Sequence, residues 1–225
     1  MATVTLNESQ QKAISHNKGP LLIIAGAGTG KTTVVTERIK YLIQKKKISP
    51  EHILALTFTE KAAAEMEDRI DRIMPYGYTQ LWISTFHSFC DQILKTDGMQ
   101  IGLVPNYKLI SEAESVQLFK RNLFKLKLDY YRPLGNPTKF IEALLTHFSR
   151  LKDEDITPLQ YTKFAQKKIK KANGPEEQED AQRISELAAA YSLYEEIKVK
   201  EGLMDFSDLI SNTLLLLRTR KKILQ

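Results

Sequence analysis

Ala25-Gly-Ala-Gly-Thr-Gly-Lys-Thr32 is the stretch that decides the fold, and the short apolar run Leu21–Ile24 comes directly before it. A run of this kind is typical of a strand that is buried on both faces. Helical periodicity follows, with Val34, Ile39 and Ile43 on one side. Strand, glycine-rich turn and helix in this order predict a P-loop, whose backbone N–H groups surround phosphates at a helix N-terminus.

Two side chains at the end of this loop carry its chemistry. We expect Lys31 to reach the β- and γ-phosphates of a nucleotide and the Thr32 hydroxyl to be the metal ligand, on Mg²⁺. The usual pattern begins with glycine, and we interpret Ala25 as a tolerated variant. A glycine-rich turn that binds nothing would not account for a lysine and a threonine directly after the last glycine. The predicted phosphate-binding residues are Ala25, Gly26, Ala27, Gly28, Thr29, Gly30, Lys31 and Thr32.

The first hundred residues alternate between apolar runs and helical patterns. Ile53–Leu56 and Leu81–Ile83 are two further short apolar runs, and a helical pattern follows each of them. This alternation predicts an α/β fold with a parallel sheet covered by helices. Tyr107–Ile110 could be one more strand, and Ser111 with Glu114 forms the capping box of a long helix. From there to Arg220 only helical patterns follow, so we expect an all-helical insert after the α/β block.

A P-loop ATPase also needs an acidic residue at the end of another buried strand, to hold Mg²⁺ and orient the attacking water. None of the three strands expected near the N-terminus ends in Asp or Glu. Asp205 and Asp208 stand in a helical context and are poor candidates for this role. No arginine finger is identifiable either.

Composition narrows the class of protein. The 225 residues are 42% hydrophobic with a net charge of +6, which fits a folded chain and suggests a polyanionic partner without showing one. The single cysteine, Cys90, excludes a disulfide framework and is expected to be a buried thiol in a reducing interior. The N-terminus has no secretory signal, and the longest apolar run, Leu214–Leu217, is far too short to span a membrane. We therefore expect a soluble cytoplasmic protein with no membrane partner.

Two charge runs interrupt the helical part of the chain. Lysines gather at residues 163–171 and acidic residues at 176–180. A solvated helix end and loop is favoured for both runs over a contact with DNA. Trp82, within an expected strand, is interpreted as a core residue rather than a stacking platform.

Several segments resemble the N-terminal portion of superfamily 1 helicases of the UvrD/Rep/PcrA type, including their AddA/RecB-like relatives. Leu6–Gln10 resembles the adenine-recognising glutamine motif, and Ala25–Thr32 resembles the first helicase motif. Thr57–Met66 resembles motif Ia, and Ser84–Phe89 resembles the next DNA-contacting motif. Met204–Leu209 is a weaker match to the point where the family's chain returns from its helical insert.

The resemblance implies a split architecture. Residues 1–100 would form the first part of a RecA-like P-loop motor subdomain, a parallel sheet with helices on both faces. Residues 101–199 would form an all-helical inserted subdomain, and residues 200–225 would return to the motor. The acidic Mg²⁺ motif and a second motor subdomain with arginine fingers would follow, so the chain would be a fragment that is inactive alone.

The resemblance also implies roles for individual residues. Lys31 and Thr32 would be catalytic, and Gln10 would hydrogen-bond the adenine edge. Thr33 stands where the family often has an arginine that stacks on adenine, which weakens base selectivity. Phe58 would stack on a base of single-stranded DNA, or else be a core aromatic at a strand end. The remaining predicted DNA-binding residues are Thr57, Thr59 and Thr85 as phosphate donors, Lys61 as a phosphate partner or a solvated side chain, and His87.

Three classes of function are compatible with the sequence. The first is a motor that uses ATP and Mg²⁺ to step along single-stranded DNA and to open duplex at a junction, with an AddA/RecB-like helicase–nuclease subunit as a variant. The second is a P-loop kinase or GTPase, for which the chain lacks a guanine-recognising Asn-Lys-x-Asp. The third is a non-enzymatic module that binds single-stranded DNA.

Overall fold

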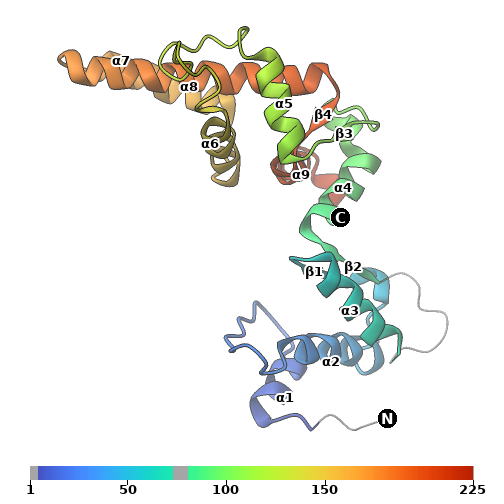
Figure 1. Ribbon diagram of the computed structural model, residues 1–225. Helices are drawn as coiled ribbons and strands as arrows, with labels where there is room; N and C mark the ends of the chain where they lie inside the picture. The colour runs from blue at the N-terminus through green and yellow to red at the C-terminus, as the bar shows by residue number, and fades with distance from the viewer. Residues whose placement is uncertain (1–4, 73–80, 225) are drawn as a thin grey trace. The chain divides into compact units, whose positions relative to one another are not determined.

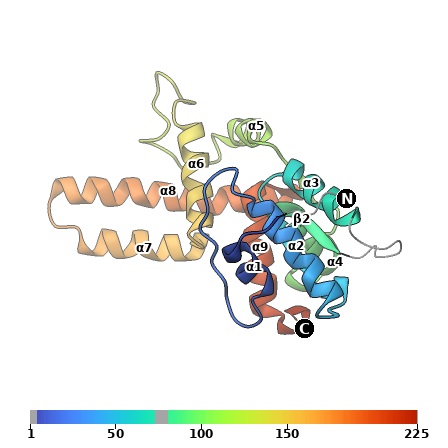
Figure 2. The same cartoon turned by 90° about the horizontal axis from the view of Figure 1, so that it is seen from below.

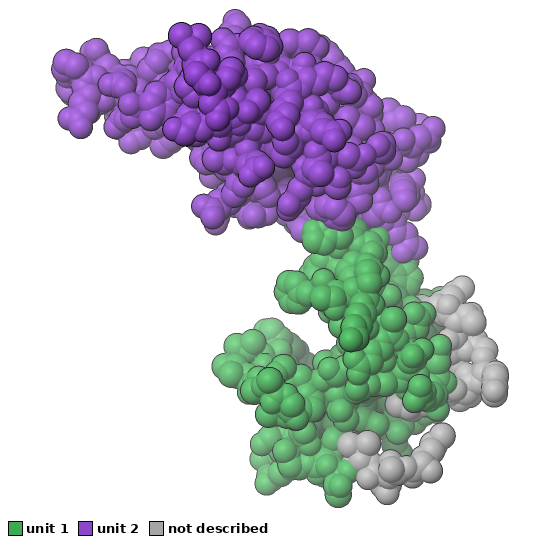
Figure 3. All heavy atoms as spheres, viewed as in Figure 1, with its two compact units in different colours: residues 1–89 green, residues 90–225 purple. Residues whose placement is uncertain are grey.

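The computed structural model describes residues 5–72 and 81–224. The chain forms two compact units, residues 1–89 and 90–225, which Figure 3 colours separately. The boundary lies inside helix α4, Phe86–Asp97. The predicted divisions at residues 100 and 199 separate functional parts rather than compact units, and they remain a prediction.

The first unit is built around a pair of parallel strands (Figure 1). Its elements are α1 Glu8–Ser15, α2 Lys31–Gln44, the 3-10 helix η1 Pro50–His52, β1 Leu54–Thr57, α3 Glu60–Asp71, β2 Trp82–Thr85 and the start of α4. The strands pair in register from Leu54 opposite Trp82 to Thr57 opposite Thr85. Two of the predicted strands and their parallel pairing are therefore confirmed. Trp82, expected in the core, is instead 40% exposed and packs edge-on against Phe89.

Apolar side chains of α2 and α3 form a small core with the first strand. Its buried members are Ile39, Ile43, Ile53, Ala55, Met66 and Ile70. The members from α3 stand four residues apart, as one face of a helix requires. The amphipathic periodicity of both helices thus explains why they cover the strands.

The predicted strand at Leu21–Ile24 is wrong, because this segment has no strand conformation in the structure. Leu22 is 83% exposed and Ile24 is 89% exposed. A strand exists only where a neighbour satisfies its backbone hydrogen bonds, and among the described residues β1 and β2 pair only with each other. An apolar run predicts burial, but it does not supply the neighbouring strand.

The second unit is mainly helical. Its elements are the end of α4, the 3-10 helix η2 Gly98–Ile101, β3 Lys108–Leu109, α5 Glu112–Asn122, α6 Ile141–Asp153, α7 Pro158–Lys171, α8 Pro175–Lys200, β4 Leu203–Met204, α9 Phe206–Thr219 and the 3-10 helix η3 Lys221–Leu224. Helices α7 and α8 lie side by side as a long hairpin in both ribbon views (Figures 1 and 2). The capping box of Ser111 and Glu114 is confirmed. The two-residue strand β4 pairs in parallel with β3, so the prediction of helices alone over this region was wrong.

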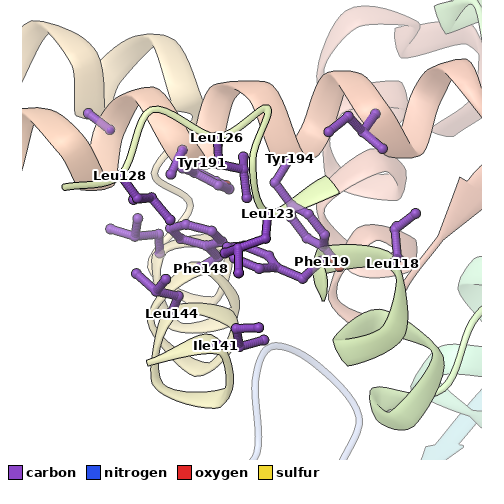
Figure 4. Packing of buried hydrophobic residues seen from close by; sticks show 14 of the residues in the cluster. Leu118, Phe119, Leu123, Leu126, Leu128, Ile141, Leu144, Phe148, Tyr191 and Tyr194 are labelled. Carbon is purple, nitrogen blue, oxygen red and sulfur yellow. The ribbon is translucent and has the colours of Figure 1, made fainter. Parts of the chain in front are cut away.

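Aromatic side chains from three helices fill the core of the second unit (Figure 4). Phe119 of α5 lies 5.6 Å from Tyr194 of α8, measured between ring centroids. Phe148 of α6 stacks on Tyr191 of α8 at 5.1 Å. Phe119 of α5 and Tyr194 of α8 are 75 residues apart in the sequence, so these contacts join helices that are distant along the chain.

Cys90 is buried as expected, and burial raises the pKa of its thiol.

A buried network of charges joins α6, α8 and α9. Lys198 Nζ lies 2.6 Å from a carboxylate oxygen of both Asp205 and Asp208. Lys152 Nζ lies 2.5 Å from Asp208 and 3.0 Å from Asp205. Both ammonium groups also lie 2.9 Å from Glu195. Burial raises the pKa of the Asp205 carboxyl, but Lys198 and Lys152 outweigh burial and hold it well below its usual value.

We predict that Lys198→Met destabilises the chain strongly. Removal of one ammonium group leaves the three carboxylates of this network with Lys152 as their one remaining cation, and breaking a buried ion pair in this way typically costs ~3–5 kcal/mol. Lys200→Met, at an exposed position on the same helix, is the matched control and should be nearly neutral. Denaturant unfolding of the two variants measures the difference. Equal free energies of unfolding would show that the network adds nothing to stability.

Candidate nucleotide and nucleic-acid sites

The glycine-rich loop turns the chain into the N-terminus of α2. Gly28 has a φ of 74° and Gly30 has a φ of 85°, in the left-handed region that favours glycine. A Cβ atom on Gly30 would lie 3.3 Å from Nε2 of Gln10, so a side chain there would also crowd its neighbour. Gly30 is the N-cap of α2 and offers no side chain to the first N–H groups of the helix. Those donors lack acceptors within the helix and therefore suit an anion.

Lys31 is the first residue of α2 and folds back over this loop. Its Nζ donates hydrogen bonds to the backbone carbonyl oxygens of Ala25, at 2.8 Å, and Gly26, at 2.6 Å. The hydroxyl of Thr29 donates to the Gly26 oxygen at 2.8 Å and closes the loop. The ammonium group is thus held at the loop, where phosphate oxygens could replace the carbonyl oxygens as its acceptors. Thr32 and Thr33 follow as half-buried residues of the first turn of α2.

Gln10, which was predicted to bind the nucleotide, lies against the same loop. Its Nε2 donates to the backbone oxygen of Thr29 at 3.1 Å. Its Oε1 accepts from the backbone N–H of Asn7 at 2.9 Å, and the Asn7 side chain accepts from the Gln10 N–H in return. This capping box at the start of α1 fixes the direction of the Gln10 amide. The structure therefore brings Gln10 and the glycine-rich loop together.

Arg38 joins α1 to α2, and it was not predicted from the sequence. Its Nη1 lies within hydrogen-bond distance of three backbone oxygens at the end of α1, those of Ala13, Ile14 and His16, at 3.0, 3.0 and 2.9 Å. A cation at a helix C-terminus interacts favourably with the free carbonyl groups there. The one signal in the sequence is the position of Arg38, two helical turns after Lys31 and therefore on a similar side of α2.

A second group of predicted residues gathers where the two parallel strands end. Thr57 and Thr85 are opposite one another as the last residues of β1 and β2, so the segments that follow begin at one edge of the sheet. Phe58 follows β1 with 91% of its surface exposed, and Phe86 follows β2 with 40% exposed. Their ring centroids lie 5.5 Å apart at an interplanar angle of 45°. Phe86 was not predicted, although its position one residue after a strand matches that of Phe58.

The three threonines predicted to bind phosphates all have partners within the protein. The buried Thr57 hydroxyl lies 3.2 Å from both the backbone N–H and the backbone oxygen of Thr59. The Thr59 hydroxyl accepts from the Ala62 N–H as the N-cap of α3. The buried Thr85 hydroxyl donates to Glu60 at 2.9 Å. A phosphate would have to compete with these contacts.

The other two predicted DNA-binding residues lie near the beginnings of helices. Lys61 is exposed in the first turn of α3, and His87 is half-buried as the second residue of α4. Both therefore stand close in sequence to the exposed rings at the edge of the sheet.

The acidic cluster of the second unit does not resemble an open metal site. Carboxylate oxygens of Glu195, Asp205 and Asp208 lie within 4.8 Å of one another. Lys152 and Lys198 each contact all three carboxylates, so two ammonium groups already offset most of the negative charge. Asp205 also caps α9, together with Asp208 in a capping box. The cluster is accounted for as a structural ion network.

None of the helices in the described part of the chain has both the length and the apolar character needed to cross a membrane.

Comparison with known proteins assigns the chain to a family. The family model for the UvrD/REP helicase N-terminal domain matches residues 6–225. The ATP-dependent DNA helicase PcrA of Bacillus subtilis (strain 168) is 37% identical over 210 residues, which cover 93% of this chain and 26% of that protein. The PcrA protein of Staphylococcus aureus (strain Mu50) is 35% identical over 220 residues, covering 98% and 27%. The chain therefore spans about a quarter of the length of these relatives.

The matched region includes both groups of site residues, the loop with Gln10 and the segments at the ends of β1 and β2. With nearly the whole chain matched, we conclude that it belongs to the UvrD/REP helicase family, as an N-terminal fragment.

Proposed function

We propose that this chain is the part of an ATP-dependent DNA helicase that binds Mg²⁺–ATP and single-stranded DNA, in a cytoplasmic protein. The proposal is supported above all by the glycine-rich loop, because both Lys31 and Gln10 form hydrogen bonds to its backbone. The names of the relatives agree with this function. In the longer protein, residues 1–100 and 200–225 form a RecA-like motor subdomain with helices on both faces of its sheet. Residues 101–199 form the helical insert.

The donors of the loop fit a triphosphate with its metal ion. The N-terminus of α2 offers backbone N–H groups, Lys31 offers an ammonium group and Thr32 offers a hydroxyl oxygen for Mg²⁺. Gln10 recognises the edge of adenine through its amide, which has both a donor and an acceptor. Thr33 is too short to stack on the base as an arginine would.

We predict that Lys31→Ala weakens ATP binding by ~1.5–3 kcal/mol, about tenfold or more, since a hydrogen bond to a charged group is lost. Titration calorimetry with Mg²⁺–ATP measures the change. Lys45→Ala, which removes an exposed lysine at the opposite end of α2, is the control and should bind like the parent. Equal affinity of the Lys31 variant and the parent would contradict the assignment of the loop.

The exposed rings at the end of the sheet suit single-stranded DNA. A base can stack on Phe58, which is almost fully exposed, without any requirement for a particular sequence. Lys61, His87 and the threonine hydroxyls of Thr57, Thr59 and Thr85 then lie near the sugar–phosphate chain. Binding at this surface places the single strand at a junction with duplex, which the downstream motor subdomain helps to open.

We predict that Phe58→Ala weakens the binding of an oligothymidylate by ~1–3 kcal/mol, the contribution of one stacked base. The binding of both proteins should fall as salt concentration rises, because counterions are released from the DNA. Phe124→Ala, which removes another strongly exposed ring, is the control for lost aromatic surface. Fluorescence anisotropy that shows the same affinity for Phe58→Ala and the parent would exclude Phe58 from the site.

We further predict that the 225-residue chain alone does not release phosphate from ATP, with or without DNA. Two carboxylates were considered for the catalytic role, those of Asp205 and Asp208. Both form ion pairs with Lys152 and Lys198 and cannot also orient a water for attack. An arginine finger would contribute roughly 10³–10⁵ in rate, and it belongs to the later motor subdomain. A phosphate-release assay compares the chain with the longer protein and its Lys31→Ala variant. Turnover by the chain that depends on Lys31 would contradict this proposal.

A further inference from the structure

Glu60 connects the two segments that follow the parallel strands. It is the first residue of α3, and its Oε1 accepts hydrogen bonds from the hydroxyls of Thr85, at 2.9 Å, and Ser88, at 2.8 Å. The two donors lie 25 and 28 residues further along the chain. All three residues belong to the first compact unit. One carboxylate oxygen therefore links the start of α3 to the start of α4.

The segment that Glu60 binds contains the second aromatic ring. The Ser88 N–H donates to the Thr85 hydroxyl at 3.1 Å, which closes the turn from Thr85 to Ser88. Phe86 and His87 lie between these two residues. Since Glu60 holds both ends of the turn, it limits the positions that the Phe86 ring can take beside Phe58.

Helix capping does not account for this arrangement. Thr59 already caps α3 through the Ala62 N–H. An acidic residue in a first helical turn gains a modest interaction with the helix dipole even when its side chain points to solvent. The Glu60 side chain instead reaches a different segment. It is also unsuited to contact DNA directly, because a carboxylate repels phosphates.

We infer that Glu60 is a positioning residue, which holds the Phe86 turn against Phe58 so that the two rings form one preformed surface for bases. This inference rests on the proposed binding of single-stranded DNA. A preformed surface loses less conformational entropy on binding than two separately mobile segments would. Glu60 thus raises the affinity for DNA without touching it.

The test is a set of variants of the 225-residue chain, titrated with an oligothymidylate by fluorescence anisotropy. Glu60→Ala should weaken binding about two- to tenfold, as expected for the loss of ordinary hydrogen bonds. Glu60→Gln should bind like the parent, because its amide oxygen can accept the same two hydrogen bonds. Ser88→Ala, which removes one of the two donors, should fall between them. Glu67→Ala removes an exposed charge from the same helix and is the control for charge alone.

A double-mutant cycle separates positioning from general stability. In the Phe58→Ala background the Glu60→Ala change should have no further effect, because the ring against which Glu60 holds the Phe86 turn is gone. Additive losses would overturn the inference, as would parental or tighter binding by Glu60→Ala. Absence of binding by the parent chain would overturn the proposed function, and the inference with it.

Discussion

The parallel pairing of β1 with β2 is the constraint on which the candidate DNA surface depends. The pairing is in register, so Thr57 and Thr85 end the two strands opposite one another. Phe58 and Phe86 therefore emerge at the same edge of the sheet, and Glu60 spans the short distance between the two turns. A shift of the register by one residue would move the following side chains to the opposite face and separate the rings.

The candidate nucleotide site depends on a different set of contacts in the same unit. Glycines with positive φ allow the loop to turn, and the Lys31 ammonium group donates to a backbone oxygen of the loop. Gln10 of α1 donates to another backbone oxygen of the loop. Arg38 then joins the end of α1 to α2, the helix that follows the loop, so α1 contacts this part of the chain at both of its ends. The helical second unit has its own core and its own buried ion network. Both candidate sites thus lie within residues 1–89, which form one compact unit.

Local patterns predicted much of this fold, and contacts between distant residues account for what they missed. Periodicity and capping residues identified helices such as α3 and the capping box at Ser111, because these signals lie within a few residues. Leu21–Ile24 was predicted as a strand from its apolar side chains, but strand formation also needs a partner from elsewhere in the chain. For the same reason, Glu60 and Arg38 could not be recognised from the sequence, since their hydrogen bonds reach residues 22 to 28 positions away. The turn of the loop could be predicted because its glycines are themselves the signal, whereas the roles of the loop and of Phe58 in binding remain predictions.

We infer that residues 1–89 contain both the candidate nucleotide site and the candidate single-strand site. Amide hydrogen exchange tests it most directly, because a ligand slows the local opening of the segments that it binds. We predict that Mg²⁺–ATP slows exchange in residues 25–33, and that an oligothymidylate slows exchange in residues 57–61 and 85–88. Slower exchange confined to residues 90–225 with either ligand would contradict it.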